Sequence, residues 1–263
     1  MRSNKSRIYS SKIIKAGALL ADTKALLANW DNSLPLVDNL ARFRQENIFG
    51  KASRSRVEDI LDIFRQRYLN EDDVTKALAT FINGGLPSES LDRILYYHAA
   101  RADPLLHDFV IELVQPRYET GLRDLHLEDA EGWIRKKIDE GKTHSTWSES
   151  TIRRSASGLM TTLRDFGVLQ GARNKSLAPI YLPAEAFSYI AFYLSKIQPS
   201  GKRLIEDPDW SLFFLTSQTV EHFFMEAHQL HLLNYQAAGS VILITFPAES
   251  LEEYAHVILE RSN

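Results

Sequence analysis

The 263-residue chain contains no cysteine. Disulfides, thiolate metal sites and cysteine nucleophiles are therefore excluded, which fits the reducing cytoplasm. It also lacks a Gly-rich phosphate loop, a Gly-x-Ser-x-Gly elbow and a dinucleotide fingerprint. Glu252 and Glu253 are adjacent, so on a helix they point in different directions and do not form an acid–base pair. The sequence thus predicts a protein that is not an enzyme, with no cofactor and no small-molecule substrate.

A long apolar run that would cross a membrane is missing as well. The basic start at residues 1–7 is not followed by the apolar stretch of a secretory signal. Residues 227–248 carry no Asp, Glu, Lys or Arg, but their histidines, amides and proline are poorly tolerated in hydrocarbon. We interpret this segment as a helix end, a turn at Gly239 and a buried strand at 241–246. The composition predicts a soluble cytoplasmic protein without membrane contact.

Net positive charge is absent overall but concentrated locally. The chain has a net charge of -3 and a pI near 6.3, which argues against a bulk polycationic binder of nucleic acid. Residues 133–175, however, hold 9 Lys and Arg against 4 Asp and Glu, and residues 1–67 hold 13 against 7. Such clustering is the electrostatic footprint of a polyanion-binding surface. The two basic regions form either one assembled surface or two separate ones.

Helical periodicity dominates the first half of the chain. Apolar residues at spacings of three and four predict helices over 8–27, 36–45, 53–68, 72–83, 88–97 and 104–116. Short helices joined by loops of a few residues make a compact bundle. We therefore predict a mainly α protein, with an N-terminal helical bundle over residues 1–120 and a winged-helix-like domain with additional helices over 121–263.

The stretch 128–182 has the pattern of a winged helix-turn-helix. A first helix is predicted over 128–140, ended by Gly141, and a second begins at the capping residue Ser148 and ends at Gly167. The second helix carries one apolar stripe, formed by Ile152, Ala156, Leu159, Leu163 and Phe166. Two short strands, 168–170 and 180–182, are predicted around the basic loop 171–175 as a small β-hairpin.

A second helix of this kind can enter the DNA major groove with its N-terminal residues nearest the base edges. The residues predicted to contact DNA are polar residues of this helix and cations of the loop: Thr151, Arg153, Arg154, Ser155, Arg173 and Lys175. Another candidate patch, Lys51, Arg54 and Arg56, lies at a helix start, where free amides and the helix dipole favour phosphate. The alternative for both patches is a solvated helix face.

Histidines at positions 222, 228 and 231, with Glu221 and Glu226, raise the question of a metal site. His228 and His231 would lie about one turn apart, close enough to share a cation. The His-Glu-x-x-His arrangement is absent, and neighbouring leucines indicate a packing helix with histidines at its edge. We predict no metal.

Several short blocks together resemble the BrxA family, the small non-enzymatic component A of BREX (bacteriophage exclusion) antiviral defence systems. The blocks are Tyr9-Ser10, 16–20, Trp30-Asp31, Asn39-Leu40, 51–56, 103–109 and 163–169. The resemblance implies a largely helical, DNA-binding protein with similarity to the NusB-type antitermination fold. It also implies partners among other BREX proteins, including a methyltransferase and an ATPase. It supplies no functional residues, so the sites above rest on charge and helix geometry.

The combined prediction is a non-enzymatic accessory protein of BREX that binds double-stranded DNA with weak sequence preference, because phosphate contacts carry no sequence information. Two alternatives stay open. In the first, the winged helix docks another BREX subunit, with Arg153 and Arg154 against an acidic partner. In the second, the N-terminal bundle binds RNA as an antitermination-like protein.

Overall fold

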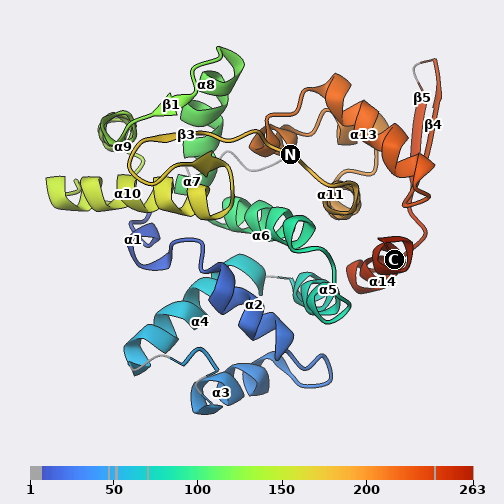
Figure 1. Cartoon of the computed structure of the whole chain (residues 1–263), viewed down its shortest axis with the longest axis horizontal. Coiled ribbons are helices and arrows are strands. Elements are labelled where there is room, and N and C mark those ends of the chain that lie inside the picture. The colour runs from blue at the N-terminus through green and yellow to red at the C-terminus, as the bar shows by residue number, and fades with distance from the viewer. Residues whose placement is uncertain (1–7, 47, 51–52, 70, 240, 263) are drawn as a thin grey trace. The chain divides into compact units, whose positions relative to one another are not determined.

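The computed structural model describes residues 8–46, 48–50, 53–69, 71–239 and 241–262. These residues are mainly helical, with small antiparallel sheets that include a C-terminal hairpin (Figure 1). No described helix has the length and apolar character needed to cross a membrane. The mainly α fold class is therefore confirmed.

The chain packs into two compact units, and neither is continuous in sequence. The first unit combines residues up to 19 with residues 99–180, and the second combines residues 20–98 with residues 181–263. The helix α6 (Ser88–Ala102) runs through the point where the chain passes between them. The predicted domain boundary at residues 120 and 121 stays a prediction, while packing divides the chain at other places.

The first unit contains the stretch predicted to form a helix-turn-helix. Its elements are α1 (Ile13–Ala16), α7 (Pro104–Phe109), η1 (Val110–Val114), α8 (Gln115–Glu119), β1 (Asp124–Leu125), α9 (Leu127–Asp139), α10 (Glu149–Asp165), β2 (Leu169–Gln170) and β3 (Lys175–Leu177). Asp103 caps α7 by accepting from the amides of Leu105 and Leu106. The backbone of Gly141 and Gly167 is left-handed, with φ of +72° and +71°, which confirms the predicted ends of α9 and α10.

The small sheet of this unit differs from the predicted hairpin. Its strand order is β1-β3-β2, with Leu169 opposite Leu177 and Leu125 opposite Lys175. The expected strand at 180–182 was wrong, and the chain returns earlier, at Lys175–Leu177. The reason is Gly171, whose φ of +89° turns the chain at once and brings Leu177 into the core beside Leu169. Strand β1 had no signal in the sequence.

The second unit is an aromatic-rich helical assembly. Its elements are α2 (Leu20–Ala28), α3 (Leu36–Glu46), α4 (Arg54–Tyr68), α5 (Asp72–Asn83), most of α6, α11 (Ala184–Ile197), α12 (Gly201–Ile205), η2 (Pro208–Phe213), α13 (Ser217–Gln229), β4 (Asn234–Ala238), β5 (Val241–Thr245) and α14 (Leu251–Ser262). Phe187 stacks on Trp210 with ring centroids 4.8 Å apart, and the Tyr97 hydroxyl donates to Asp209 over 3.0 Å. Such buried, paired polar groups specify one packing arrangement.

Two further predictions are corrected by the structure. The helix expected over 8–27 is divided into α1 and α2 at Gly17, where a φ of +49° interrupts the helical backbone. The strand expected to be buried at 241–246 is β5, and it forms an exposed hairpin with β4. Val241 is 67% exposed and Leu243 53%, because one face of this two-stranded sheet has no covering layer within the described residues.

Candidate nucleic-acid interface

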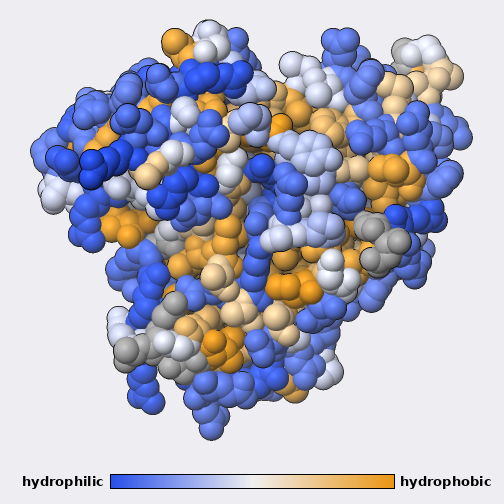
Figure 2. Space-filling view, in the orientation of Figure 1, coloured by the Kyte–Doolittle hydropathy of each residue, from blue (hydrophilic) through white to orange (hydrophobic). Residues whose placement is uncertain are grey.

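Helix α10 is the framework of the candidate interface. The Ser148 hydroxyl caps it by accepting from the Thr151 amide over 3.3 Å. The predicted apolar stripe is buried, with Ile152 3% exposed and Ala156 fully buried, and α10 packs on α9 through this side. Burial of the stripe turns the opposite face of the first two turns outward. Side chains over this free end of α10 are hydrophilic (Figure 2).

Arg153 and Arg154 lie on that outward face. Both side chains are exposed, and neither has a hydrogen bond or ion pair within the described part of the chain. An exposed guanidinium with no internal carboxylate keeps all five N–H donors for an external partner. The structure therefore leaves the two central predicted residues accessible.

Several nearby cations are instead neutralised. The pairs are Arg135 with Glu149 at 2.6 Å, Lys136 with Glu140 at 3.9 Å, Lys137 with Glu112 at 2.6 Å, and Arg164 with Asp165 at 2.7 Å. The hydrogen bond from Arg135 holds the pKa of Glu149 below its usual value. The other five cations between residues 133 and 175 make no hydrogen bond or ion pair with a carboxylate among the described residues: Lys142, Arg153, Arg154, Arg173 and Lys175. Of these, Lys142 interacts with Glu140 through charge alone. The excess positive charge thus belongs to these five side chains.

The two hydroxyls predicted to contact DNA differ in burial. The Thr151 hydroxyl shares a hydrogen bond of 2.9 Å with Ser148 and is half-buried at the start of α10. Ser155 is fully buried, so its hydroxyl is not exposed, and its contact with DNA stays a prediction. The reason for its burial is helical spacing: Ser155 lies three residues after Ile152 and beside Ala156, on the face that packs inward.

The loop between β2 and β3 carries the next cation. Gly171 permits a tight turn, since a Cβ there would lie 2.1 Å from the Asn174 carbonyl oxygen. Arg173 is exposed on this loop. Lys175 belongs to β3 rather than to the loop, and its ammonium donates to the Ala172 carbonyl over 3.2 Å. Arg173 is therefore the more accessible of the two.

The second predicted patch lies in the second unit, at the start of α4. Ser53 caps this helix by accepting from the Arg56 amide over 3.4 Å. Arg54 is exposed, whereas Arg56 is half-buried and interacts within the chain. Lys51 lies outside the described residues. Arg54 is thus the accessible cation of this patch.

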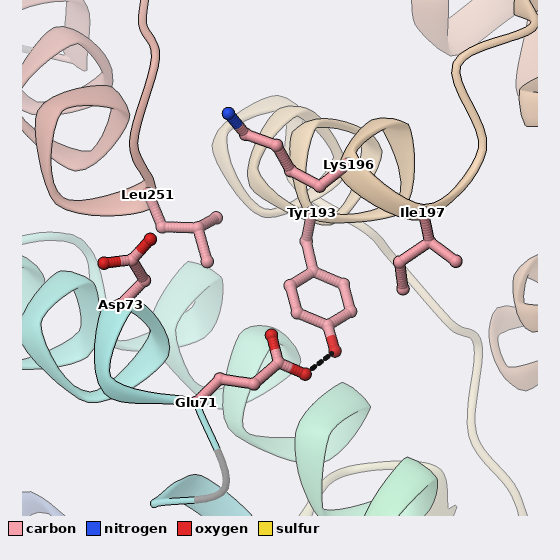
Figure 3. Close-up of a pocket in the computed structure, with 6 residues that line it drawn as sticks. All are labelled: Glu71, Asp73, Tyr193, Lys196, Ile197 and Leu251. Carbon is pink, nitrogen blue, oxygen red and sulfur yellow. Dashed lines mark hydrogen bonds between the residues drawn. The ribbon is translucent and has the colours of Figure 1, made fainter.

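A histidine-containing segment and a cleft, both in the second unit, are two other candidate sites. Among the described residues, no group of three or more His, Asp or Glu side chains is placed to hold a metal ion, and His228 lies 3.4 Å from the Leu233 carbonyl oxygen. A cleft of about 350 Å³ in the second unit is lined by Glu71, Asp73, Tyr193, Lys196, Ile197 and Leu251 (Figure 3).

Three polar groups of this cleft, Glu71, Tyr193 and Lys196, are engaged with one another or with the backbone. The Tyr193 hydroxyl donates to Glu71 over 2.7 Å, which links α11 to the start of α5. The Lys196 ammonium donates to the Glu249 carbonyl and lies 4.7 Å from the Phe192 ring centroid. These contacts hold elements of the second unit together.

Comparison with known proteins identifies the family. The structure defines a mainly helical protein with small antiparallel sheets. The family model of BrxA matches residues 7–193, so the chain belongs to the BrxA family, and membership implies a component of a BREX defence system. Members of this family are generally non-catalytic. No curated protein matches the chain.

A solved structure shares the fold. It is the crystal structure of an uncharacterized protein from Magnetospirillum magneticum, with a TM-score of 0.58 and 16% sequence identity. The similarity covers 72% of this chain and 94% of that chain. At this identity, the likeness describes the fold alone.

Sequence reasoning missed two parts of the site. One is Lys142, in the turn between α9 and α10, whose place directly after the helix-ending Gly141 is the signal that could have identified it. The other is the segment around Tyr9, which contacts the same turn. Nothing in local spacing signals a contact across more than 100 residues.

Proposed function

We propose that this protein binds double-stranded DNA without transforming it, as an accessory protein of a BREX defence system in the cytoplasm. The contact surface consists of the first turns of α10, the turn before it and the loop 171–174. Other BREX proteins are its proposed protein partners. Fold and family membership support the assignment to a BREX system. The electrostatics of the first unit support DNA as the ligand.

The order of elements supports a winged helix-turn-helix. Helices α7 to α8, strand β1, helices α9 and α10, and strands β2 and β3 follow one another, with sheet order β1-β3-β2. In a winged helix-turn-helix, the second helix of the motif enters the major groove, and the hairpin loop lies along the phosphate backbone. We propose that α10 and the loop with Arg173 take these roles in this chain.

One observation carries the proposal. Arg153 and Arg154 are exposed without internal partners near the N-terminal end of α10, while four other cations of the same region are paired with carboxylates. An unpaired guanidinium releases counterions when it meets a phosphate and can bind guanine bidentately. Weak sequence preference is expected, because most of the proposed contacts are to phosphate.

The test is a titration of duplex DNA at several salt concentrations. If about five phosphates are neutralised, the logarithm of the affinity falls with the logarithm of the salt concentration at a slope of roughly −4 to −5. Arg153→Ala/Arg154→Ala is expected to weaken binding and to reduce the slope by about 2. The matched control, Lys136→Ala/Arg164→Ala, removes the same charge from paired cations and should leave the slope close to that of the wild type.

Equal effects of the two double variants would refute the proposed contact surface. A BREX partner that co-purifies after nuclease treatment, and is lost only in Arg153→Ala/Arg154→Ala, would support the docking alternative. Stronger competition by structured RNA than by duplex DNA would support the alternative that the predicted N-terminal bundle binds RNA. Arg54→Ala tests whether that bundle contributes to the affinity for duplex DNA or for RNA.

A further inference from the structure

A short N-terminal segment contacts both the turn and the second helix of the helix-turn-helix. We call residues 9–17 the N-terminal strap. The Tyr9 amide donates to the Lys142 carbonyl over 2.7 Å, and Tyr9 forms a parallel bridge with Thr143. Helix α1, a few residues later in the strap, packs on α10. The strap therefore pairs with the turn through a β-bridge and packs against the helix that follows the turn.

The side chain of Tyr9 ties this arrangement to the rest of the first unit. It is only 3% exposed, and its ring stacks on Trp133 of α9 with centroids 6.1 Å apart. Its hydroxyl donates to Asp108 of α7 over 2.6 Å, and the other oxygen of Asp108 lies 2.8 Å from His107. Burial raises the pKa of Tyr9 far above its usual value, so the hydroxyl stays a donor. One side chain thus joins α7, α9 and the strap.

The turn itself has few other anchors. Residues 141–146 are exposed or half-buried, and none is an apolar side chain inserted in the core. Within the described residues, the other hydrogen bonds of the turn are local: the Gly141 amide donates to the Ile138 carbonyl, the Lys142 amide to the Lys137 carbonyl, and the Thr143 hydroxyl to the Ser145 carbonyl. A turn held mainly by local bonds samples several geometries unless another element restrains it.

Helix α1 also determines which part of α10 is left uncovered. Gly158 lies against the main chain of Ile13, and Arg154 lines the edge of the shallow groove between α1 and α10. From Ser148 to Arg154 the helix rises by about 9 Å, at roughly 1.5 Å per residue. After Arg154, α10 is packed against α1.

We infer that Tyr9 is a positioning residue for DNA binding, one that fixes the turn and α10 so that Lys142 and the first two turns of α10 meet the duplex together. The inference rests on the proposed function. Tyr9 is buried and does not contact DNA. It acts by fixing the positions of the cations on both sides of Ser148 relative to one another. This lowers the conformational-entropy cost of ordering the turn when DNA binds.

The experiment uses the full chain with Tyr9→Phe and Tyr9→Ala, each also combined with Arg153→Ala/Arg154→Ala. Duplex affinity, thermal stability and hydrogen exchange of residues 140–150 are measured well below the melting temperature. Tyr9→Ala should weaken binding about tenfold, the size expected for one lost charge-assisted hydrogen bond, and should speed exchange in the turn. Tyr9→Phe keeps the ring stacking and should fall between Tyr9→Ala and the wild type.

The combined variants separate positioning from simple loss of fold. If Tyr9 acts through α10, its effect on affinity should largely vanish once Arg153 and Arg154 are replaced. Wild-type affinity and unchanged turn exchange in folded Tyr9→Ala would overturn the inference, as would a penalty that is fully additive with the arginine changes. If the wild type fails to bind duplex DNA, the proposed function fails, and the exchange rates still decide whether Tyr9 orders the turn.

Discussion

Gly158 of α10 lies directly against the main-chain carbonyl of Ile13. A Cβ at position 158 would be 3.1 Å from that oxygen, closer than carbon and oxygen normally pack. Glycine in a helix interior costs about 1 kcal/mol relative to alanine, so its place here has a structural reason. It lets α1 approach one side of α10, while the apolar stripe packs on α9. The two contacts together leave the side chains of Arg153 and Arg154 exposed to solvent.

The first prediction concerns this close approach. Gly158→Leu should push α1 away from α10 and lower the free energy of unfolding by about 1–3 kcal/mol, the usual cost of overpacking. Urea denaturation followed by circular dichroism measures the change. The control is Gly132→Ala in α9, where a Cβ meets nothing within 4 Å. That change should stabilise the protein by about 0.5–1 kcal/mol.

A Gly158→Leu protein as stable as the wild type would show that α1 is not packed on α10 in solution. The comparison with Gly132→Ala matters because both changes remove a helical glycine. A shared gain in stability would then reflect helix propensity, and only a difference between the two reports on the contact with Ile13.

The second prediction concerns the loop after β2. Gly171 has a φ of +89°, and a Cβ there would lie 2.1 Å from the Asn174 carbonyl oxygen. Gly171→Ala should therefore cost about 1–3 kcal/mol of stability through backbone strain. If Arg173 meets phosphate, the displaced loop should also reduce the salt slope of DNA binding by about 1.

Ala172→Ser is the control for this loop, because Ala172 is exposed and a hydroxyl there adds no strain. It should match the wild type in both measurements. A stable Gly171→Ala protein would contradict the loop geometry. A destabilised variant with an unchanged salt slope would show that Arg173 does not contact phosphate, while supporting the described geometry of the turn.

The third prediction concerns alkaline pH. Burial raises the pKa of Tyr68 to about 12, from an ordinary value near 10 in the unfolded chain. The folded state therefore favours the neutral phenol. Its contribution to stability is complete below pH 10 and is lost as the pH rises from 10 through 12. Tyrosinate absorbance and circular dichroism, recorded against pH, should show Tyr68 ionising together with loss of structure.

Tyr68→Phe removes that titrating group, at the cost of a hydrogen bond of 3.3 Å to the Leu95 carbonyl. It should be somewhat less stable at neutral pH and lose less stability between pH 10 and 12. Equal alkaline slopes for the two proteins would show that Tyr68 does not contribute. Burial also raises the pKa of Tyr96, so some alkaline sensitivity should remain in the variant.

The parts of the fold that sequence could predict are those encoded within a few residues. Ser148, Gly141 and Gly167 are local signals for helix ends, and the stripe from Ile152 follows from helical spacing. The limit of such reasoning is seen at Ser155. The spacing of the apolar stripe predicts Ser155 on or near the opposite, polar face, but its position beside Ala156 buries it.

The pairing of β1 with β3 and the contact of Tyr9 with Asp108 were beyond local reasoning. Strand β1 has two residues, too few to show an alternating pattern. Tyr9 and Asp108 are separated by 99 positions, and both lie in short blocks that resemble the BrxA family. Those blocks indicated kinship, but they did not indicate that the two residues meet.

By itself, the sequence determined the mainly helical character, the ends of the helices around residue 145 and the kinship with BrxA, because each depends on residue order along the chain. Only the tertiary structure decided which of the clustered cations stay available. Arg135 reaches Glu149, fourteen residues further on, and both charges are satisfied. Arg153 and Arg154 find no such carboxylate among the described residues. Charge can be counted in a sequence, but its neutralisation depends on distances that exist only once the chain is folded.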